Sequence, residues 1–166
     1  MAAETQESMT TQVYEVYIKA PAEVIWDAIT TPEWTAQYGY RAPAEYELRA
    51  GGAFHYRATP QMRQMGMQEI IIDGKVIEAL PPKKLVHSYR FLFTEQQKAE
   101  GFTKITWEIE PTGLGFCRLT VTHEVAGAPV AAAMIASKFS QRGNGGWSWI
   151  LSDMKSLLET GKTLAA

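Results

Sequence analysis

Apolar and polar residues alternate through the middle of the chain, which predicts β-strands there. Residues 102–110 place Trp107 on the same face as the apolar residues two positions to either side, and residues 116–125 do the same for Val121 and His123. The opposite faces are polar, as expected of an antiparallel sheet with one buried side. The same kind of pattern predicts further strands in residues 13–19, 44–57, 68–80 and 85–93.

The apolar spacing changes near the C-terminus and predicts one long amphipathic helix. Between Trp147 and Leu158 the apolar residues fall at helical spacing, while polar residues, Asp153 among them, fill the other side. Gly161 follows as a helix cap. This helix supplies the large apolar surface that the covered face of the sheet needs.

Shorter segments also carry helix signals. Pro21 stands where proline suits the first turn of a helix, and Thr31-Pro32 is the N-terminal signature of another. Residues 129–139 are alanine-rich and apolar, which predicts a further helix just before the long one. Residues 94–101 are polar, and we expect them to form a connection.

The order of these elements predicts an α+β fold. It runs strand, two short helices, about six strands and one long helix, and lacks the strand–helix alternation of a parallel sheet. Gly51-Gly52 is expected to form a tight hairpin turn, and Asp73-Gly74 a bulge or turn. We expect residues 1–10 to be a flexible tail and residues 11–166 to form a single domain.

Composition narrows the classes of partner and location. The chain has 166 residues, 46% of them hydrophobic and 20% charged, which is ordinary for a soluble domain. Its formal net charge of -2 argues against binding to nucleic acid or to an anionic membrane, because proteins that bind these partners carry clusters of basic residues. The single cysteine, Cys117, rules out an intramolecular disulfide. Since no secretory signal or membrane-length apolar run is visible, we expect a cytoplasmic protein.

Six short motifs give the chain a family resemblance. In chain order they are Ala20-Pro21 before Trp26, Thr31-Pro32-Glu33-Trp34, Gly51-Gly52-Ala53-Phe54, Gly74-Lys75-Val76 with Pro81-Pro82-Lys83-Lys84-Leu85 after it, Thr122-His123-Glu124 and Gly145-Gly146-Trp147. This series resembles the SRPBCC superfamily, and within it the group named after the activator of the Hsp90 ATPase, C-terminal domain type. The resemblance implies a START-like helix-grip fold, in which a curved antiparallel sheet of six or seven strands wraps the C-terminal helix.

Aromatic residues are the best functional signal if the fold is of this kind, because they would converge between sheet and helix. We expect them to line an apolar cavity, in which tyrosine hydroxyls and two histidines supply the few polar groups. The alternative is that the same side chains fill the space as a solid core. The candidate ligand-binding residues are Trp34, Tyr38, Tyr40, Phe54, Tyr56, His87, Tyr89, Trp107, His123, Trp147, Leu151 and Met154.

Three functions stay open at this point. The first is non-catalytic binding of a small hydrophobic or aromatic molecule in the cavity. The second is a protein-binding module like the co-chaperone relatives, and the third is a cyclase or aromatase type of enzyme with His87 or His123 as acid or base. Each histidine also fits a structural role with a backbone hydrogen bond. Whether the chain is a monomer or a homodimer is left open.

No cofactor or metal is expected from the sequence. The three histidines have no HxxxH or HxH spacing and no clustered acidic residues, so a metal site is not predicted. The segment Gly143-Asn144-Gly145-Gly146 precedes the long helix. It is interpreted as a flexible hinge, with anion binding at the helix N-terminus as the alternative.

Overall fold

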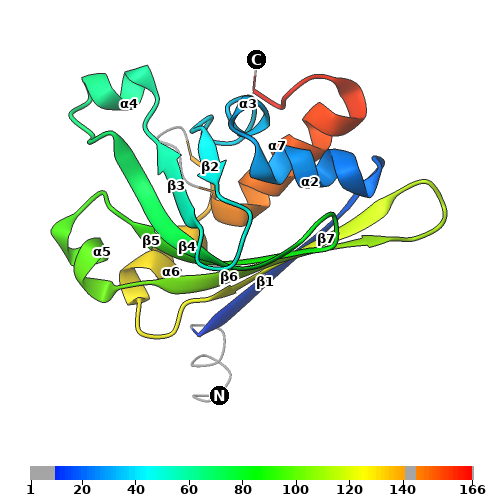
Figure 1. Ribbon diagram of the computed structural model, residues 1–166. Helices are drawn as coiled ribbons and strands as arrows, with labels where there is room; N and C mark the ends of the chain where they lie inside the picture. The colour runs from blue at the N-terminus through cyan, green and yellow to red at the C-terminus, as the bar shows by residue number, and fades with distance from the viewer. Residues whose placement is uncertain (1–9, 141–144, 166) are drawn as a thin grey trace, which may run out of the picture.

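The computed structural model describes residues 10–140 and 145–165. One curved antiparallel sheet forms the body of the molecule, and α2, α3 and α7 lie together over one of its faces (Figure 1). The strands are β1 (Thr11–Ile18), β2 (Ala44–Tyr46), β3 (Ala53–Arg57), β4 (Ile70–Leu80), β5 (Lys84–Phe91), β6 (Thr103–Pro111) and β7 (Cys117–Glu124). The helices are α2 (Ala22–Thr30), α3 (Pro32–Thr35), α4 (Pro60–Gln64), α5 (Glu95–Glu100), α6 (Pro129–Ile135) and α7 (Gly146–Thr160).

The sheet has seven strands in the order β1-β7-β6-β5-β4-β3-β2. Strands β2 to β7 follow one another as antiparallel neighbours, and the first strand returns to pair with the last, with Tyr14 opposite Val121. The helix-grip fold predicted by the resemblance is therefore confirmed. The domain boundaries predicted from the sequence remain a prediction, because residues 1–9 lie outside the described part of the chain.

The long C-terminal helix lies where its apolar spacing predicts. Trp147, Leu151, Met154 and Leu157 are buried on the side of α7 that faces the sheet and α2. The helix ends at Gly161, whose left-handed backbone conformation suits glycine at a helix cap. Sheet, α2 and α7 thus share one continuous hydrophobic core.

Asp153 is an exception to the polar, exposed face that the sequence predicts for this helix. Its side chain is only 1% exposed. One carboxylate oxygen accepts a hydrogen bond from the amide of Gly39 at 2.8 Å, and the other from the amide of Leu164 at 2.7 Å. The physical reason is that the loop after α3 and the C-terminal segment cover this side of α7, and their amide groups satisfy the carboxylate.

Two other segments differ from the predictions. The polar stretch expected to be a connection contains α5, because Thr94 and Gln97 form a reciprocal capping box at its start. Asp73-Gly74 is not a bulge or turn, since β4 runs straight through it and the irregularity falls between Val76 and Glu78. Gly74 instead lets a neighbouring strand approach, as a Cβ there would lie 2.0 Å from the carbonyl oxygen of Ser88.

The segment preceding α7 is described only in part. Residues 143 and 144, on which the hinge interpretation rests, lie outside the described residues. Gly145 and Gly146 both have positive φ angles. A Cβ on Gly146 would lie 1.8 Å from the carbonyl oxygen of Ile135, so the start of α7 is packed directly against the end of α6.

Candidate functional site

The structure brings most of the predicted ligand-binding residues into one aromatic cluster between the sheet and α7. Trp34 and Tyr56 are half-buried at its margin, and Tyr40 is 42% exposed because it lies in the loop after α3. The buried members are Tyr38, Phe54, His87, Tyr89, Trp107, His123, Trp147, Leu151 and Met154.

His87 is held by a tryptophan of the neighbouring strand. The indole Nε1 of Trp107 donates to Nε2 of His87 at 3.0 Å, and Nδ1 of the same ring lies 3.0 Å from the carbonyl oxygen of Ser88. Because an indole N–H can only donate, Nε2 must be the unprotonated nitrogen and Nδ1 must carry the proton. Both ring nitrogens of His87 are therefore used within the protein.

His123 is held in the opposite way. The indole Nε1 of Trp147 donates to Nδ1 of His123 at 3.0 Å, so the proton lies on Nε2. That nitrogen is 2.6 Å from the hydroxyl of Thr103, which donates in turn to the carbonyl oxygen of Tyr89 at 3.0 Å. The sequence analysis missed Thr103, although the alternation that places Ile105 and Trp107 on the buried face places Thr103 there as well.

Both histidines are fully buried and neutral. Burial lowers the pKa of His87 to about 4 and that of His123 to about 3, because a charged imidazolium loses its hydration in this layer. Neither ring has a free nitrogen with which to take a proton from a substrate or to bind a metal ion. The arrangement gives these histidines a structural role within the aromatic cluster.

Tyr46 also belongs to the cluster, although it is not among the candidate residues predicted from the sequence. Its ring stacks on Phe54 at 4.6 Å and meets the edge of His87 at 5.3 Å. Its hydroxyl is buried and has no hydrogen-bond partner among the described residues. The hydroxyl of Tyr56 lies near enough for a weak hydrogen bond between the two groups to affect the pKa of both phenols, although this contact falls outside standard hydrogen-bond geometry. The alternation of Tyr46 with Glu45 and Glu47 is the signal that places it on the buried face.

Tyrosine hydroxyls gather around this position. Burial raises the pKa of Tyr46, Tyr38 and Tyr89 well above the ordinary value, and that of Tyr56 to about 12. The hydroxyl of Tyr56 adds to the effect at each of the other three. Tyr38 donates to the carbonyl oxygen of Ala28 at 2.6 Å. Tyr46 thus holds a buried hydroxyl without a hydrogen bond of standard geometry in a region rich in phenols.

Two hollows on the outside of the described structure stand out, and neither is lined by the aromatic cluster. One, of about 350 Å³, lies between the β6–β7 hairpin, the end of β1 and α7, and includes Leu114 and Lys155. The other, of about 450 Å³, lies between β1 and α6. The aromatic cluster itself is packed, with ring centroids of neighbouring members about 4 to 6 Å apart.

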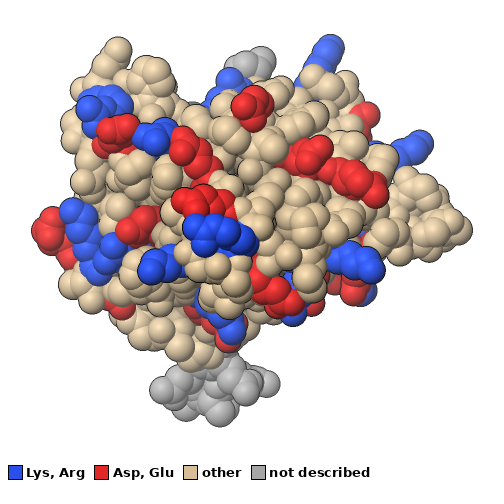
Figure 2. Space-filling view, viewed as in Figure 1, with Lys and Arg blue, Asp and Glu red and all other residues tan. Residues whose placement is uncertain are grey.

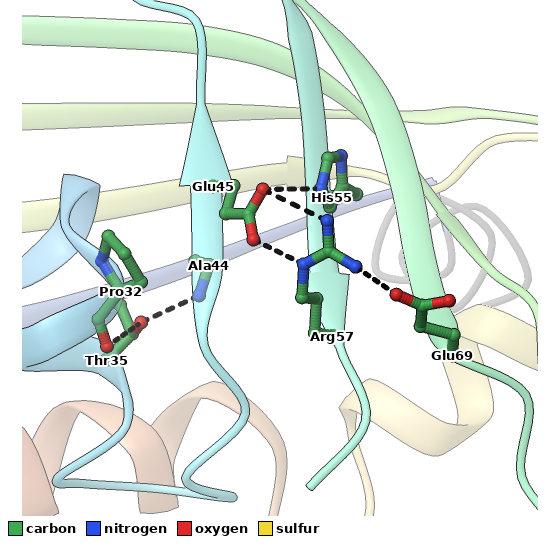
Figure 3. A network of polar contacts seen from close by, with 7 residues as sticks. All are labelled: Pro32, Thr35, Ala44, Glu45, His55, Arg57 and Glu69. Carbon is green, nitrogen blue, oxygen red and sulfur yellow. Dashed lines mark hydrogen bonds and ion pairs between the residues drawn. The ribbon is translucent and has the colours of Figure 1, made fainter.

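The outer side of the short strand β2 carries a network of charges (Figure 3). Glu45 binds Arg57 and lies 2.9 Å from Nε2 of His55, and Arg57 also reaches Glu69 at 2.5 Å. The hydrogen bond from Arg57 lowers the pKa of the Glu45 carboxyl. The amide of Ala44 donates to the hydroxyl of Thr35 at 2.8 Å, which ties this edge of the sheet to α3.

On the face that Figure 2 displays, acidic and basic side chains are interspersed, and no patch of a single charge is seen. Among the described residues, no three side chains of His, Cys, Asp or Glu are grouped so that they could hold a metal ion. No described helix has the length and hydropathy to cross a membrane.

Comparison with known proteins identifies relatives across most of the chain. The model of the family "Activator of Hsp90 ATPase homolog 1-like protein" matches residues 19–159. Among curated proteins, none matches.

Several solved structures share the fold. An HSP90 activator from Plasmodium falciparum is 20% identical, with a TM-score of 0.54, over 93% of this chain and 91% of that one. The Aha1 dimer from Colwellia psychrerythraea is 18% identical, with a TM-score of 0.59, over 92% and 98%. The crystal structure of CalU16 from Micromonospora echinospora is 17% identical, with a TM-score of 0.51, over 68% of this chain and 59% of that chain, so this chain spans less than two thirds of that crystallised chain.

Proposed function

This chain belongs to the activator of Hsp90 ATPase homolog 1-like family, and from that membership we propose that it is a non-catalytic module that binds a protein partner of the Hsp90 chaperone class. The observation that supports the proposal is the close packing of the aromatic cluster. Its rings contact one another between sheet and α7, and its two histidines are hydrogen-bonded to two tryptophans. A function that needs no interior cavity fits this packing best, and such a function lies on the surface.

The related structures support the class of partner. The Plasmodium falciparum protein is described as an HSP90 activator, and the Colwellia psychrerythraea protein as an Aha1 dimer. A cytoplasmic location goes with this proposal, since the sequence predicts it independently. Self-association into a homodimer is the alternative assembly that the second of these relatives suggests.

The test is a binding and ATPase measurement with purified Hsp90. We expect the full chain to bind Hsp90 and to raise its rate of ATP hydrolysis, with both effects saturating at the same concentration of the chain. An inhibitor of the Hsp90 nucleotide site is added in a parallel reaction, so that contaminating ATPases are subtracted. If the chain neither binds Hsp90 nor changes its ATPase rate at concentrations up to about 100 μM, where interfaces of standard size are normally occupied, the proposal is wrong.

A second candidate function is binding of a small aromatic molecule beside Tyr46. The observation that favours it is the buried hydroxyl of Tyr46, which lacks a hydrogen-bond partner among the described residues. Leaving such a group unpaired costs about 1–3 kcal/mol. A ligand that carries an oxygen atom would recover this cost, and some movement of neighbouring rings would make room for it.

Two ligands of similar shape test this candidate. Coumarin has a carbonyl oxygen, and naphthalene is a bicyclic molecule without one. If the hydroxyl of Tyr46 binds ligand oxygen, coumarin quenches tryptophan emission at a lower concentration than naphthalene does in the wild type, and Tyr46→Phe removes the difference. Equal behaviour of both molecules with the wild-type protein, or no quenching by either, argues against ligand binding at this position.

A further inference from the structure

The first strand leaves one edge of the sheet open. In the strand order, β1 is terminal and pairs only with β7 among the described strands. The amide of Val125 donates to the carbonyl oxygen of Thr10, and Thr11 lies opposite Glu124. Because hydrogen-bonded pairs alternate along an antiparallel ladder, the backbone groups of Thr11, Val13, Glu15 and Tyr17 point away from β7.

This edge lacks the devices that usually protect an edge strand. The opposite edge, β2, has only three residues and carries the charge network of Glu45 (Figure 3). By contrast β1 has eight residues, with neither proline nor lysine, and Val13 is 62% exposed. Its one charged residue is Glu15, which lies near Arg118. At its far end, Nζ of Lys155 donates to the carbonyl oxygen of Tyr17 at 2.8 Å. Among the described residues, the unprotected part of the edge therefore spans residues 11–14.

A groove runs along this same part of the edge. It measures about 450 Å³ and lies between residues 11–14 of β1 and the alanines of α6, Ala132, Ala133 and Ala136. Small side chains on α6 leave space beside the strand that larger ones would fill. None of the side chains that line the groove is charged.

Hydrogen bonds fix α6 at this distance from the strand. Tyr14 donates to the side-chain oxygen of Gln12 at 2.5 Å, and the amide nitrogen of Gln12 donates to the carbonyl oxygen of Ala132 at 3.1 Å. On the other side, the carboxylate of Glu100 accepts from the amides of Val130 and Ala131 at 2.7 and 3.2 Å. The helix is thus held beside β1 from both sides, and the groove is a built feature of the fold.

We propose that an extended, uncharged segment of a partner protein binds in this groove by adding a strand to the free edge of β1. The open backbone groups at every second residue fit a strand and not a helix, because a helix has satisfied its own amide and carbonyl groups. The uncharged lining and the alanines select small or β-branched apolar side chains on the face of the segment that meets α6. The inference rests on the proposed function in one respect, namely that the partner is a protein.

The backbone geometry supplies a specific variant for the test. Val13→Pro removes an amide hydrogen that points outward and has no partner within the sheet, so the fold tolerates it as edge strands tolerate proline. Val13→Thr keeps the amide and the branched side chain and is the matched control. Ala133→Trp, which fills the groove from the side of α6, is a second variant that leaves β1 unchanged.

The probe is a phage library of random peptides about twelve residues long, selected on the immobilised full chain. We expect the selected peptides to be uncharged and β-branched at alternate positions. Val13→Pro and Ala133→Trp each weaken their binding by about tenfold or more, whereas Val13→Thr changes it by less than about threefold. A library that yields no binder, or peptides that bind all variants equally, overturns the proposal. So does dimerisation of the free chain that Val13→Pro abolishes, because the edge then serves a second copy.

Binding of purified Hsp90 to the same variants separates this inference from the proposed function. If Hsp90 binds the wild type and Val13→Pro equally, the partner class stands and the groove is not its site. If the peptides bind in the expected way but Hsp90 does not bind at all, the groove stands and the partner class is wrong.

Discussion

The indole nitrogen of Trp107 lies 3.0 Å from Nε2 of His87, and this hydrogen bond fixes the position of the imidazole proton. The bond from Trp147 fixes the opposite tautomer on His123. We therefore predict that nitrogen-15 NMR of the imidazole rings at neutral pH finds His87 protonated on Nδ1 and His123 on Nε2. Two rings with the same tautomer would show that one of these indole bonds does not form.

The stability of the protein is predicted to fall as the pH decreases from 7 to 5. Both buried histidines have folded pKa values, about 4 and about 3, below the unfolded value of 6.5. Below pH 6.5 the unfolded state thus binds more protons than the folded state, so acid favours unfolding. Each histidine lowers the free energy of unfolding by about 2 kcal/mol at pH 5, which urea denaturation at the two pH values measures.

His87→Gln is the control for this pH dependence. Glutamine does not titrate, and its side-chain oxygen can accept the hydrogen bond from Trp107. The loss of stability between pH 7 and pH 5 is expected to be smaller by about 2 kcal/mol in this variant. An unchanged loss would mean that His87 does not contribute to the response to acid.

Gly146→Ala is predicted to be far more damaging than Gly161→Ala. Both glycines have positive φ angles, so both substitutions strain the backbone. At Gly146 the added Cβ would also lie 1.8 Å from the carbonyl oxygen of Ile135, while at Gly161 nothing lies within 4 Å. Gly161→Ala should cost about 1 kcal/mol and Gly146→Ala at least about 3 kcal/mol in urea denaturation. If the two substitutions lowered the free energy of unfolding by similar amounts, α6 and α7 would have to move apart at little cost.

Asp153→Ala is predicted to loosen the two segments that cover this side of α7, namely the loop after α3 and the C-terminal segment. Its carboxylate accepts hydrogen bonds from the amides of Gly39 and Leu164, and removing the carboxylate leaves both N–H groups without this acceptor. We expect a destabilisation of about 2–4 kcal/mol and faster hydrogen exchange at Gly39. Ser152→Ala, at an exposed neighbouring position, should change stability by less than about 0.5 kcal/mol. Exchange at Gly39 that stays slow in Asp153→Ala would contradict the role assigned to the carboxylate.

The sequence predicted the fold well because two periodicities carry most of the information. Alternation placed Trp107, Val121 and His123 on the buried face, and helical spacing placed Trp147 and Leu151 on the buried side of α7, as the structure has them. Burial of one face of each element is enough to specify a sheet wrapped around a helix. The pattern therefore predicts the α+β fold and its buried faces, and the family resemblance adds the helix-grip architecture.

The details that depend on contacts between distant segments could not be predicted. Asp153 looks like a surface residue of a helix, since the amides that it binds come from residue 39 and from beyond the helix. For the same reason, the pairing of each histidine with a particular tryptophan could not be foreseen, although all four residues were candidates. Whether the space between sheet and helix is filled depends on how these rings interlock, and periodicity says nothing about that.

Because β1 pairs with β7, the first strand emerges from the ribosome long before its partner has been synthesised. Until the last strand is complete, both edges of β1 are free, and the sheet is completed only by a contact between its first and its last strand. Such non-local pairing slows folding and prolongs the time in which an apolar strand is open to wrong neighbours. The interval of translation between these two strands is therefore when the nascent chain is most vulnerable to misassembly.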